Sequence, residues 1–372
     1  MSLHSVDAAL AVAYRHRQPL CLIASRRQID CAALGGGYVN DWTTEEFVHY
    51  VRARDPENLI TLARDHGGPF QRDAEKSLLL PDAMAVAQAS FGADILSGLK
   101  ILHLDPEKAV ERGAPGAVQQ FTDLTIDMLL TANQFAQSHG ITDVVFEIGT
   151  DEGIGEDMSV ADWDTFLGRV ITAAAAANAN RPVTFAVPMG TKVKETRNVG
   201  AMAAGTDAAW QARVAALQEL ARKYNLILKL HNADYISAGV IERFMGLGVR
   251  CMNVAPELGV VESRTLVGLL RQNGLGHLAD EFLARALASR KWERWLAPRS
   301  AVTDEEKALM AGHYVFAQPE VIALKTEAAH ALQTSGINLP ACLQQAIETV
   351  IEHYLLSLHA SAKKNYIEQR AA

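Results

Sequence analysis

The sequence predicts an α/β fold, a TIM-type (β/α)8 barrel with additional C-terminal helices. Short apolar runs rich in β-branched residues recur along the first two thirds of the chain, and they are continuous, as in strands buried on both faces. Helical patterns separate them, and this alternation predicts a parallel sheet with right-handed crossovers. The number of repeats favours a closed barrel over an open, doubly wound sheet.

Seven strands are expected in order, at residues 19–25, 58–63, 99–105, 143–150, 183–190, 226–231 and 251–255. The eighth strand of a barrel is not evident. It is expected either within residues 1–15, where Val6 to Tyr14 fits a helix better, or near Tyr314-Val-Phe316.

Helices are expected between the strands at 118–137, 160–177, 207–223 and 237–246, and later at 261–271, 277–289, 304–317, 319–334 and 340–363. The last carries apolar residues at helical spacing, which is typical of a packing element or a subunit contact. No linker divides the chain. We therefore expect a single domain over residues 1–372, with the barrel at about 1–275 and a helical extension at about 276–372.

Composition excludes several classes of protein. With 49% hydrophobic and 21% charged residues, the chain is typical of soluble globular proteins. No apolar run approaches the roughly 20 residues of a membrane span, and the N-terminus lacks a secretory signal, so a cytoplasmic location is expected. A net charge of −8 disfavours nucleic acid as a partner. Four well-separated cysteines argue against a disulfide framework or a thiolate zinc cluster.

Polar residues follow the ends of two successive predicted strands. His231 and Asp234 come after the strand at 226–231, and Asn253 and Glu257 after the next. In a parallel barrel the active site lies where strands end, so these side chains should share one mouth, which indicates an enzyme. A core histidine bonded to backbone is the alternative for His231.

Two further strand ends each carry a histidine and an acidic residue close to it. His66 could ligate a divalent metal while Asp65 moves a proton, although a surface turn made by the following Gly-Gly-Pro is the alternative. His103 and Asp105 alternate, so both face the same way. The inside is favoured because polar groups facing helices are costly. Asp105 is the better functional candidate and His103 a support.

The next two strand ends carry charged candidates. Glu147 and Asp151 could serve as metal ligand or general base. Lys192 could bind a substrate oxygen, neutralise an enediolate or form a Schiff base if it is buried. A solvated loop lysine is the alternative. The glycines at 35–37 are weak evidence for phosphate binding.

Together these motifs resemble the non-catalytic accessory subunits of tagatose-bisphosphate aldolase, formerly called tagatose-6-phosphate kinases. The matches lie in order over residues 19 to about 330: Gln28–Tyr38 and Trp42–Phe47 to NQxxxGGYTGMxPxDF, Arg64–Pro69 to GDHLGP, Lys100–Asp105 to KIHLD, Ile148–Thr150 to IGTE, and His231–Tyr235 to HSTDY. That family is similar to class II aldolases, metal-dependent TIM barrels that act on ketose phosphates and include 4-epimerases among their relatives. Gly248–Leu258 looks like the end of their last strand, GVxKxNVATEL.

The resemblance implies that Asp65 is the proton-transfer carboxylate, that His66 and His231 are ligands of a divalent metal, with zinc as the expected ion, and that Asn253 contacts the substrate. The chain departs from the family at two places. A further metal-ligand histidine in GTxHG is replaced by Gly190-Thr-Lys-Val-Lys194, which weakens the metal site. The Gly-Gly-Ser phosphate loop is replaced by Asn232-Ala-Asp234, so a phosphate on the substrate is left open. The chain would be a divergent member.

The expected function is retro-aldol cleavage or 4-epimerisation of a sugar, sugar acid or sugar phosphate through an enolate stabilised by a metal or Lys192. Asp65 would move the proton, and Asp105, Glu147 and Asp234 would orient hydroxyls. The alternative is a non-catalytic subunit that stabilises the catalytic subunit of an aldolase. It predicts an incomplete metal site and an exposed apolar face, for which the helix at 340–363 is the candidate. A homo-oligomer is expected in either case.

Overall fold

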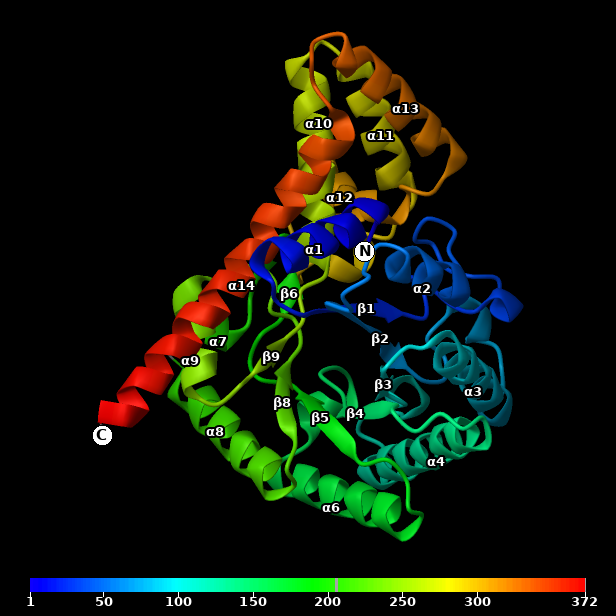
Figure 1. The fold of residues 1–372 in the computed structure, drawn as a ribbon, viewed down its shortest axis with the longest axis vertical. Helices are drawn as coiled ribbons and strands as arrows, with labels where there is room; N and C mark the ends of the chain where they lie inside the picture. Colours follow the sequence, from blue (N-terminus) through cyan, green and yellow to red (C-terminus); the bar gives the residue numbers. More distant parts are fainter. Residues whose placement is uncertain (205–206, 372) are drawn as a thin grey trace.

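A curled parallel sheet of seven strands forms the centre of the molecule (Figure 1). The computed structural model describes residues 1–204 and 207–371, without the side chains of residues 204 and 363–371. The strands pair in the order β1-β2-β3-β4-β5-β8-β9. Their bounds are Leu20–Ser25, Ile60–Gly67, Ile101–Leu104, Val145–Gly149, Pro182–Val187, Ile227–Leu230 and Cys251–Met252. All seven predicted strands are confirmed.

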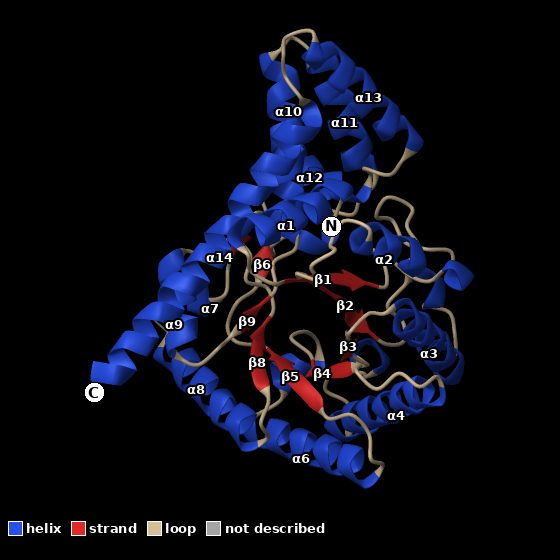
Figure 2. Cartoon of the chain, in the orientation of Figure 1, coloured by secondary structure: helices blue, strands red, loops and turns tan. Residues whose placement is uncertain are grey.

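The sheet is open, so the expectation of a closed eight-stranded barrel is met only in part. The described strands curl around a central space (Figure 2), but β9 and β1 do not pair within the part of the chain that the structure describes. Neither place expected to hold the eighth strand forms one: the first lies in α1 (Leu3–His16), and in the second Tyr314 ends the 3-10 helix η5 (Gly312–Tyr314) and Val315 and Phe316 form the turn that follows. The first is helical because Ser2 caps it and its apolar residues recur at helical spacing, which buries Val6 and Ala13 on one face.

Helices lie outside the curled sheet and connect its strands (Figure 1). They are α2 (Thr44–Arg52), α3 (Leu80–Ser97), α4 (Ala117–Ser138), α6 (Val160–Ala176), α8 (Ala208–Lys223) and α9 (Ala238–Gly246). After β4 and β5 lie the short helices α5 (Ile154–Asp157) and α7 (Ala201–Ala204) and a small antiparallel hairpin, β6 (Val193–Lys194) with β7 (Arg197–Asn198).

The C-terminal helices form a lobe with its own hydrophobic core. The lobe contains α10 (Pro256–Gln272), α11 (Gly276–Ala288), α12 (Asp304–Ala311) and α13 (Pro319–Gln333). Its buried cluster, which includes Phe282, is separate from the core around the sheet. The long helix α14 (Leu339–Ala371) begins in the lobe and then packs against α1 and α9, where Tyr354 joins the main core. Among the described residues, none of the helices has both the length and the apolar character of a membrane span.

Candidate functional site

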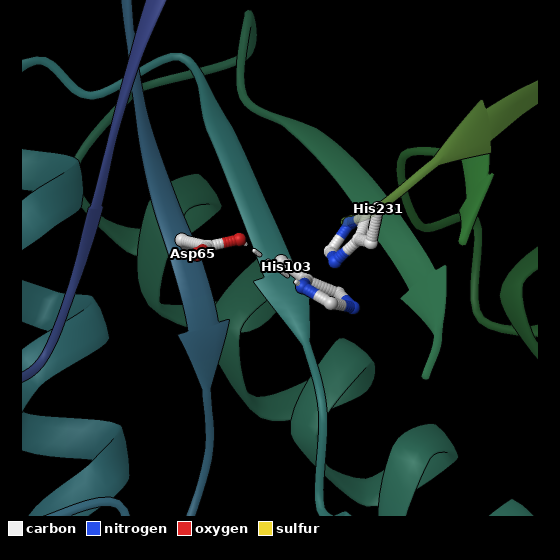
Figure 3. A group of neighbouring side chains, drawn as sticks. All are labelled: Asp65, His103 and His231. Atoms are coloured by element: carbon white, nitrogen blue, oxygen red, sulfur yellow. Dashed lines mark ion pairs between the residues drawn. The ribbon is translucent and has the colours of Figure 1, made fainter. Parts of the chain in front are cut away.

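Three histidines from different strands meet inside the curled sheet. His66 lies on β2, His103 on β3 and His231 directly after β8. Their ring centroids are 5.2 Å apart for His66 and His103, and 5.3 Å for each of the other pairs. Figure 3 shows Asp65 of β2 beside His103 and His231, with the three side chains directed toward one space. Residues far apart in the sequence therefore form one cluster at the ends of the strands.

The backbone of β2 explains how two consecutive residues reach this cluster. The strand runs to Gly67, beyond the predicted end at residue 63, and its register with β3 shifts between Arg64 and Gly67. Arg64 points outward, where its Nη2 and Nε donate hydrogen bonds to the Asp94 carboxylate at 2.6 and 2.8 Å. His66 adopts a left-handed φ of 43°. Regular alternation would place Asp65 and His66 on opposite faces, but this break lets both face inward.

Buried carboxylates hold two of the imidazoles through one nitrogen each. Nδ1 of His66 lies 2.7 Å from Oδ2 of Asp105, and Nε2 of His231 lies 3.2 Å from Oε1 of Glu147. The remaining nitrogens both face Asp151, whose Oδ1 is 3.9 Å from Nε2 of His66 and 3.0 Å from Nδ1 of His231. A carboxylate behind the imidazole is the usual way in which proteins orient a metal-ligating histidine.

His103 is bonded differently. Its Nε2 lies 2.9 Å from the carbonyl oxygen of Gly149, and its Nδ1 accepts the backbone N–H of His66 at 3.2 Å. Both nitrogens are therefore engaged in hydrogen bonds. The ring stabilises the strand ends and has no free atom for a ligand.

Lys229 and Glu147 form an ion pair below the histidines. The Lys229 ammonium lies 2.7 and 2.9 Å from the two carboxylate oxygens, and Thr184 donates to Oε2 at 3.0 Å. Burial opposes both charges, but Glu147 raises the pKa of Lys229, while Lys229 and His103 hold the pKa of Glu147 well below its usual range. Lys229 is therefore a charged partner of Glu147 and not a nucleophilic amine.

The cluster carries an excess of acid that favours bound positive charge. Burial disfavours a charged imidazole, yet Asp65 and Asp105 raise the pKa of His66 well above its usual value, and Asp151 raises that of His231 to about 9. Four carboxylates face one lysine in this interior: Asp65, Asp105, Glu147 and Asp151. Protons on the imidazoles balance that excess, and a divalent cation can replace them.

The free ligand atoms select one group of residues for a cation. Oδ1 of Asp65 and Oδ1 of Asp151 are buried and lack a hydrogen bond of good geometry among the described residues, and the Asp151 oxygen has the imidazole nitrogens of His66 and His231 as its ionic neighbours. Three overlapping groups have ligand atoms within 4.8 Å of one another, and two of these include His103. Because both nitrogens of His103 are engaged, the group with free atoms is His66, Asp151 and His231. Two imidazoles and a carboxylate suit a divalent transition metal, so the residues fit the predicted ion.

Three other candidate residues lie apart from this group. Lys192 is half-exposed and its ammonium lies 2.9 Å from Glu156, so it lacks the burial that a Schiff-base role requires. Asn253 lines the cavity beside the histidines. Asp234 is buried, and its Oδ1 accepts the backbone N–H groups of Ala255 and Glu257 at 2.9 Å.

Asp234 joins the end of β8 to the start of α10, and we expect its removal to affect stability. Asp234→Ala leaves two partly buried N–H groups without an acceptor, so the free energy of unfolding should fall by about 1–3 kcal/mol. Urea denaturation followed by circular dichroism measures this change. An unchanged midpoint would show that the two N–H groups find other acceptors.

Asp234 should also make stability depend on pH. Burial raises its pKa from 3.8 to about 7, although the N–H groups of Glu257 and Ala255 act in the opposite direction. Between about pH 4 and pH 7 the unfolded chain releases a proton that the folded chain keeps, so the free energy of unfolding falls as pH rises through this window. Asp234→Asn removes this titration. Denaturation at pH 4.5 and pH 7 should show the variant gaining stability relative to the parent chain at the higher pH.

Lys229 is the residue of this site that sequence reasoning missed. It lies in an apolar run, two positions before His231, so the alternation of a strand places both on one face. Lys229 could have been recognised because a lysine inside a strand that is buried on both faces needs an acidic partner. Asp151 was recognised as one of two acids at a strand end that could serve as metal ligand or general base, and its place between His66 and His231 is added by the structure.

A cavity of about 330 Å³ opens beside the histidines. Asp65, His66, Asp151 and His231 line it at the sheet, and residues of the C-terminal lobe line it on the other side. The volume lies at the lower end of the range for small-molecule sites, which suits a sugar-sized ligand.

Comparison with known proteins shows the fold. No family model matches the sequence, and no curated protein matches it. A probable tagatose 6 phosphate kinase from Sinorhizobium meliloti 1021 is similar in structure, with a TM-score of 0.70 and 20% identity over 95% of this chain and 97% of that one. The fructuronate-tagaturonate epimerase UxaE from Cohnella laeviribosi, bound to one glycerol, aligns with a TM-score of 0.56 and 13% identity over 94% and 79% of the two chains. The structural neighbours thus include a protein with the former name of the family that the sequence resembles, as expected for a divergent member.

Proposed function

We propose that the chain is a metal-dependent enzyme of carbohydrate metabolism that catalyses retro-aldol cleavage or 4-epimerisation of a ketose, a ketose phosphate or a sugar acid. One observation carries the proposal. His66 and His231 are each held by a buried carboxylate through one nitrogen and direct the other toward Asp151, with the unpaired oxygen of Asp65 beside them.

We assign the residues of this cluster to two roles. His66, Asp151 and His231 would hold a divalent cation, with zinc as the first candidate, and a cation there supplies Lewis acidity that polarises a substrate carbonyl. Asp105 and Glu147 act as positioning residues because their oxygens are engaged by the imidazoles and Lys229. We assign no catalytic role to Lys192.

Asp65 would move the proton. The imidazoles of His66, His103 and His231 hold its pKa below the usual range despite burial, so the carboxylate is ionised at neutral pH. It would accept the proton of the hydroxyl on the carbon β to the carbonyl, which is the far carbon of the bond to be broken and becomes the aldehyde carbon. The carbon–carbon bonding pair would then pass to the fragment that bears the carbonyl. Cleavage and 4-epimerisation share this step and differ in whether the aldehyde leaves or rebinds by its other face.

Asn253 is the candidate for a substrate contact. It lies at the end of β9 and lines the cavity, and its backbone groups pair with Leu230 and Ala233 while no described residue bonds to its side chain. Its amide is therefore free to bind a hydroxyl group.

A metal assay combined with a substrate panel tests the proposal. Purified full-length protein should contain about one divalent ion per chain and should convert one or more of a panel of ketoses, ketose phosphates and ketouronates, followed by proton NMR. Asp65→Asn should keep the ion and abolish turnover. Folded protein that binds no ion and instead co-purifies with an aldolase would favour the non-catalytic subunit.

A further inference from the structure

Arg27 lies at the cavity with its terminal nitrogens free of acidic partners. Its Nε donates to the carbonyl oxygen of Gln71 at 2.6 Å, and no carboxylate in the described parts of the chain pairs with it. The preceding Arg26 is the opposite case. Its buried guanidinium is enclosed by Asp30 and Glu75. Arg26 thus belongs to a structural ion pair, whereas the adjacent Arg27 offers a cation without an ion-pair partner at the cavity.

Arg294 reaches the same cavity from the C-terminal lobe, in the short 3-10 helix η4 (Glu293–Trp295). Its guanidinium lies 5.0 Å from the centre of the Trp295 ring and has no acidic partner within the ranges that the structure covers. The β6–β7 hairpin holds this segment in place, because Lys194 Nζ donates to the Arg294 carbonyl at 3.0 Å and the Glu195 N–H to the Trp295 carbonyl at 2.7 Å. The position of Arg294 is therefore fixed by bonds to its backbone, while its charge is free.

The two arginines bring positive charge to the cavity, and no ion pair among the described residues neutralises it. Burial lowers the pKa of Arg27 and the charge of Arg294 lowers it further, while the more distant acids Asp73 and Glu152 act in the opposite direction. Like charges placed together without a direct ion pair are typical of a site that receives an anion, since arginine matches the geometry of phosphate and carboxylate.

A buried neutral donor lies in the same part of the cavity. The side chain of Gln71 is only 5% exposed, and its Nε2 has no acceptor among the described residues. The glycine loop fixes the backbone between these groups. A Cβ on Gly37 would come within 2.2 Å of the Gln28 carbonyl oxygen, so only glycine allows this approach, and the Tyr38 N–H donates to the Arg27 carbonyl at 3.1 Å. The loop thus positions Arg27 and does not itself bind the ligand.

We propose that Arg27, Arg294 and Gln71 form an anion subsite that selects sugar substrates bearing a phosphate or carboxylate group. The subsite lies in the cavity that His66 and His231 also line, so one ligand can extend from the candidate metal residues to the arginines. The inference depends on the proposed function only for the statement that the ligand is a sugar.

Calorimetric titration of metal-free, full-length protein tests the subsite independently of the metal. The probes are inorganic phosphate and gluconate at low ionic strength, and we expect saturable binding of one or both. Phosphate alone would indicate a phosphorylated substrate, and gluconate alone a sugar acid. Arg294→Gln should weaken binding by about tenfold or more, the effect of losing a charge-assisted hydrogen bond. Since Arg294 is exposed, this variant should fold.

Arg27→Gln and a control complete the test. Arg27→Gln should weaken the same anion by a similar factor, while Arg299→Gln, an exposed arginine outside the cavity, should leave binding unchanged. Neither cavity variant should lose bound zinc in a separate metal assay. Absence of saturable binding, or equal binding by Arg294→Gln and the parent chain, would overturn the proposal. Anion binding by a protein that never binds metal would keep the subsite and reject the proposed enzyme.

Discussion

Replacing His231 with alanine is expected to remove the bound divalent metal. His66 and Asp151 would remain as the only members of the proposed ligand group, whereas catalytic metal sites generally use three protein ligands. We expect the metal content to fall from about one ion per chain to less than about a tenth of that after dialysis, because losing a ligand should weaken metal affinity by more than the 10- to 100-fold typical of supporting residues. Plasma mass spectrometry of purified protein measures it. His277→Ala, an exposed histidine of α11, is the matched control.

His103→Ala distinguishes this ligand group from the other two. Because hydrogen bonds occupy both nitrogens of His103, the variant should lose stability but keep its metal within about tenfold in affinity. If His103→Ala loses the metal while His66→Ala retains it, then Asp65, His103 and His231 hold the ion instead. Absence of metal from the parent chain under all conditions would favour the non-catalytic subunit.

The sheet was predictable because strands buried on both faces leave a strong signal. Runs such as Leu20–Ala24 are continuously apolar, and each of the seven runs became a strand. Closure was not predictable, since an eighth strand depends on long-range pairing and not on a local pattern. Of the two places expected to supply it, residues 1–15 hold the helix α1, as the spacing of Val6 to Tyr14 favoured, and α1 packs against α14, a contact between the two ends of the chain.

The residues of the candidate site could be predicted because they lie at strand ends. The backbone conformation that brings them together could not. His66 and His231 could be recognised because each follows an apolar run. The left-handed φ of His66 could not, since no local pattern marks it, and its backbone N–H is bonded to His103, a residue 37 positions away. The sequence also pointed to Lys192 as the functional lysine instead of Lys229, again because the contacts that matter are long-range. Lys192 follows a strand end, where sequence reasoning expects chemistry, whereas Lys229 is inside a strand and its partner Glu147 lies on β4.

Breaking the ion pair between Lys229 and Glu147 is expected to destabilise the fold strongly. Glu147→Met leaves the Lys229 ammonium buried without its main partner, which should lower the free energy of unfolding by about 3–5 kcal/mol. Lys229→Met should cost less, because Thr184 and His231 still contact Glu147. Denaturation in urea measures both changes.

The double variant Glu147→Met with Lys229→Met should recover most of that loss, because replacing both members of a buried pair by apolar residues of similar size is often close to neutral. The matched control is the exposed pair of Lys192 and Glu156, whose double-mutant cycle should give about 1 kcal/mol or less. Equal coupling energies in the two pairs would contradict the assignment of a buried charge pair at the centre of the sheet.

Metal affinity should not recover with stability. Glu147 also accepts from Nε2 of His231, so both Glu147→Met and the double variant leave that ring without its anchor. We expect each to bind the divalent ion about 10- to 100-fold more weakly than the parent chain, as for other residues that orient a ligand. Lys229→Met keeps Glu147, so its affinity for the ion should be closer to that of the parent chain. A double variant that is stable but weak in metal binding would therefore separate the two roles of Glu147, the charge balance of the interior and the orientation of His231.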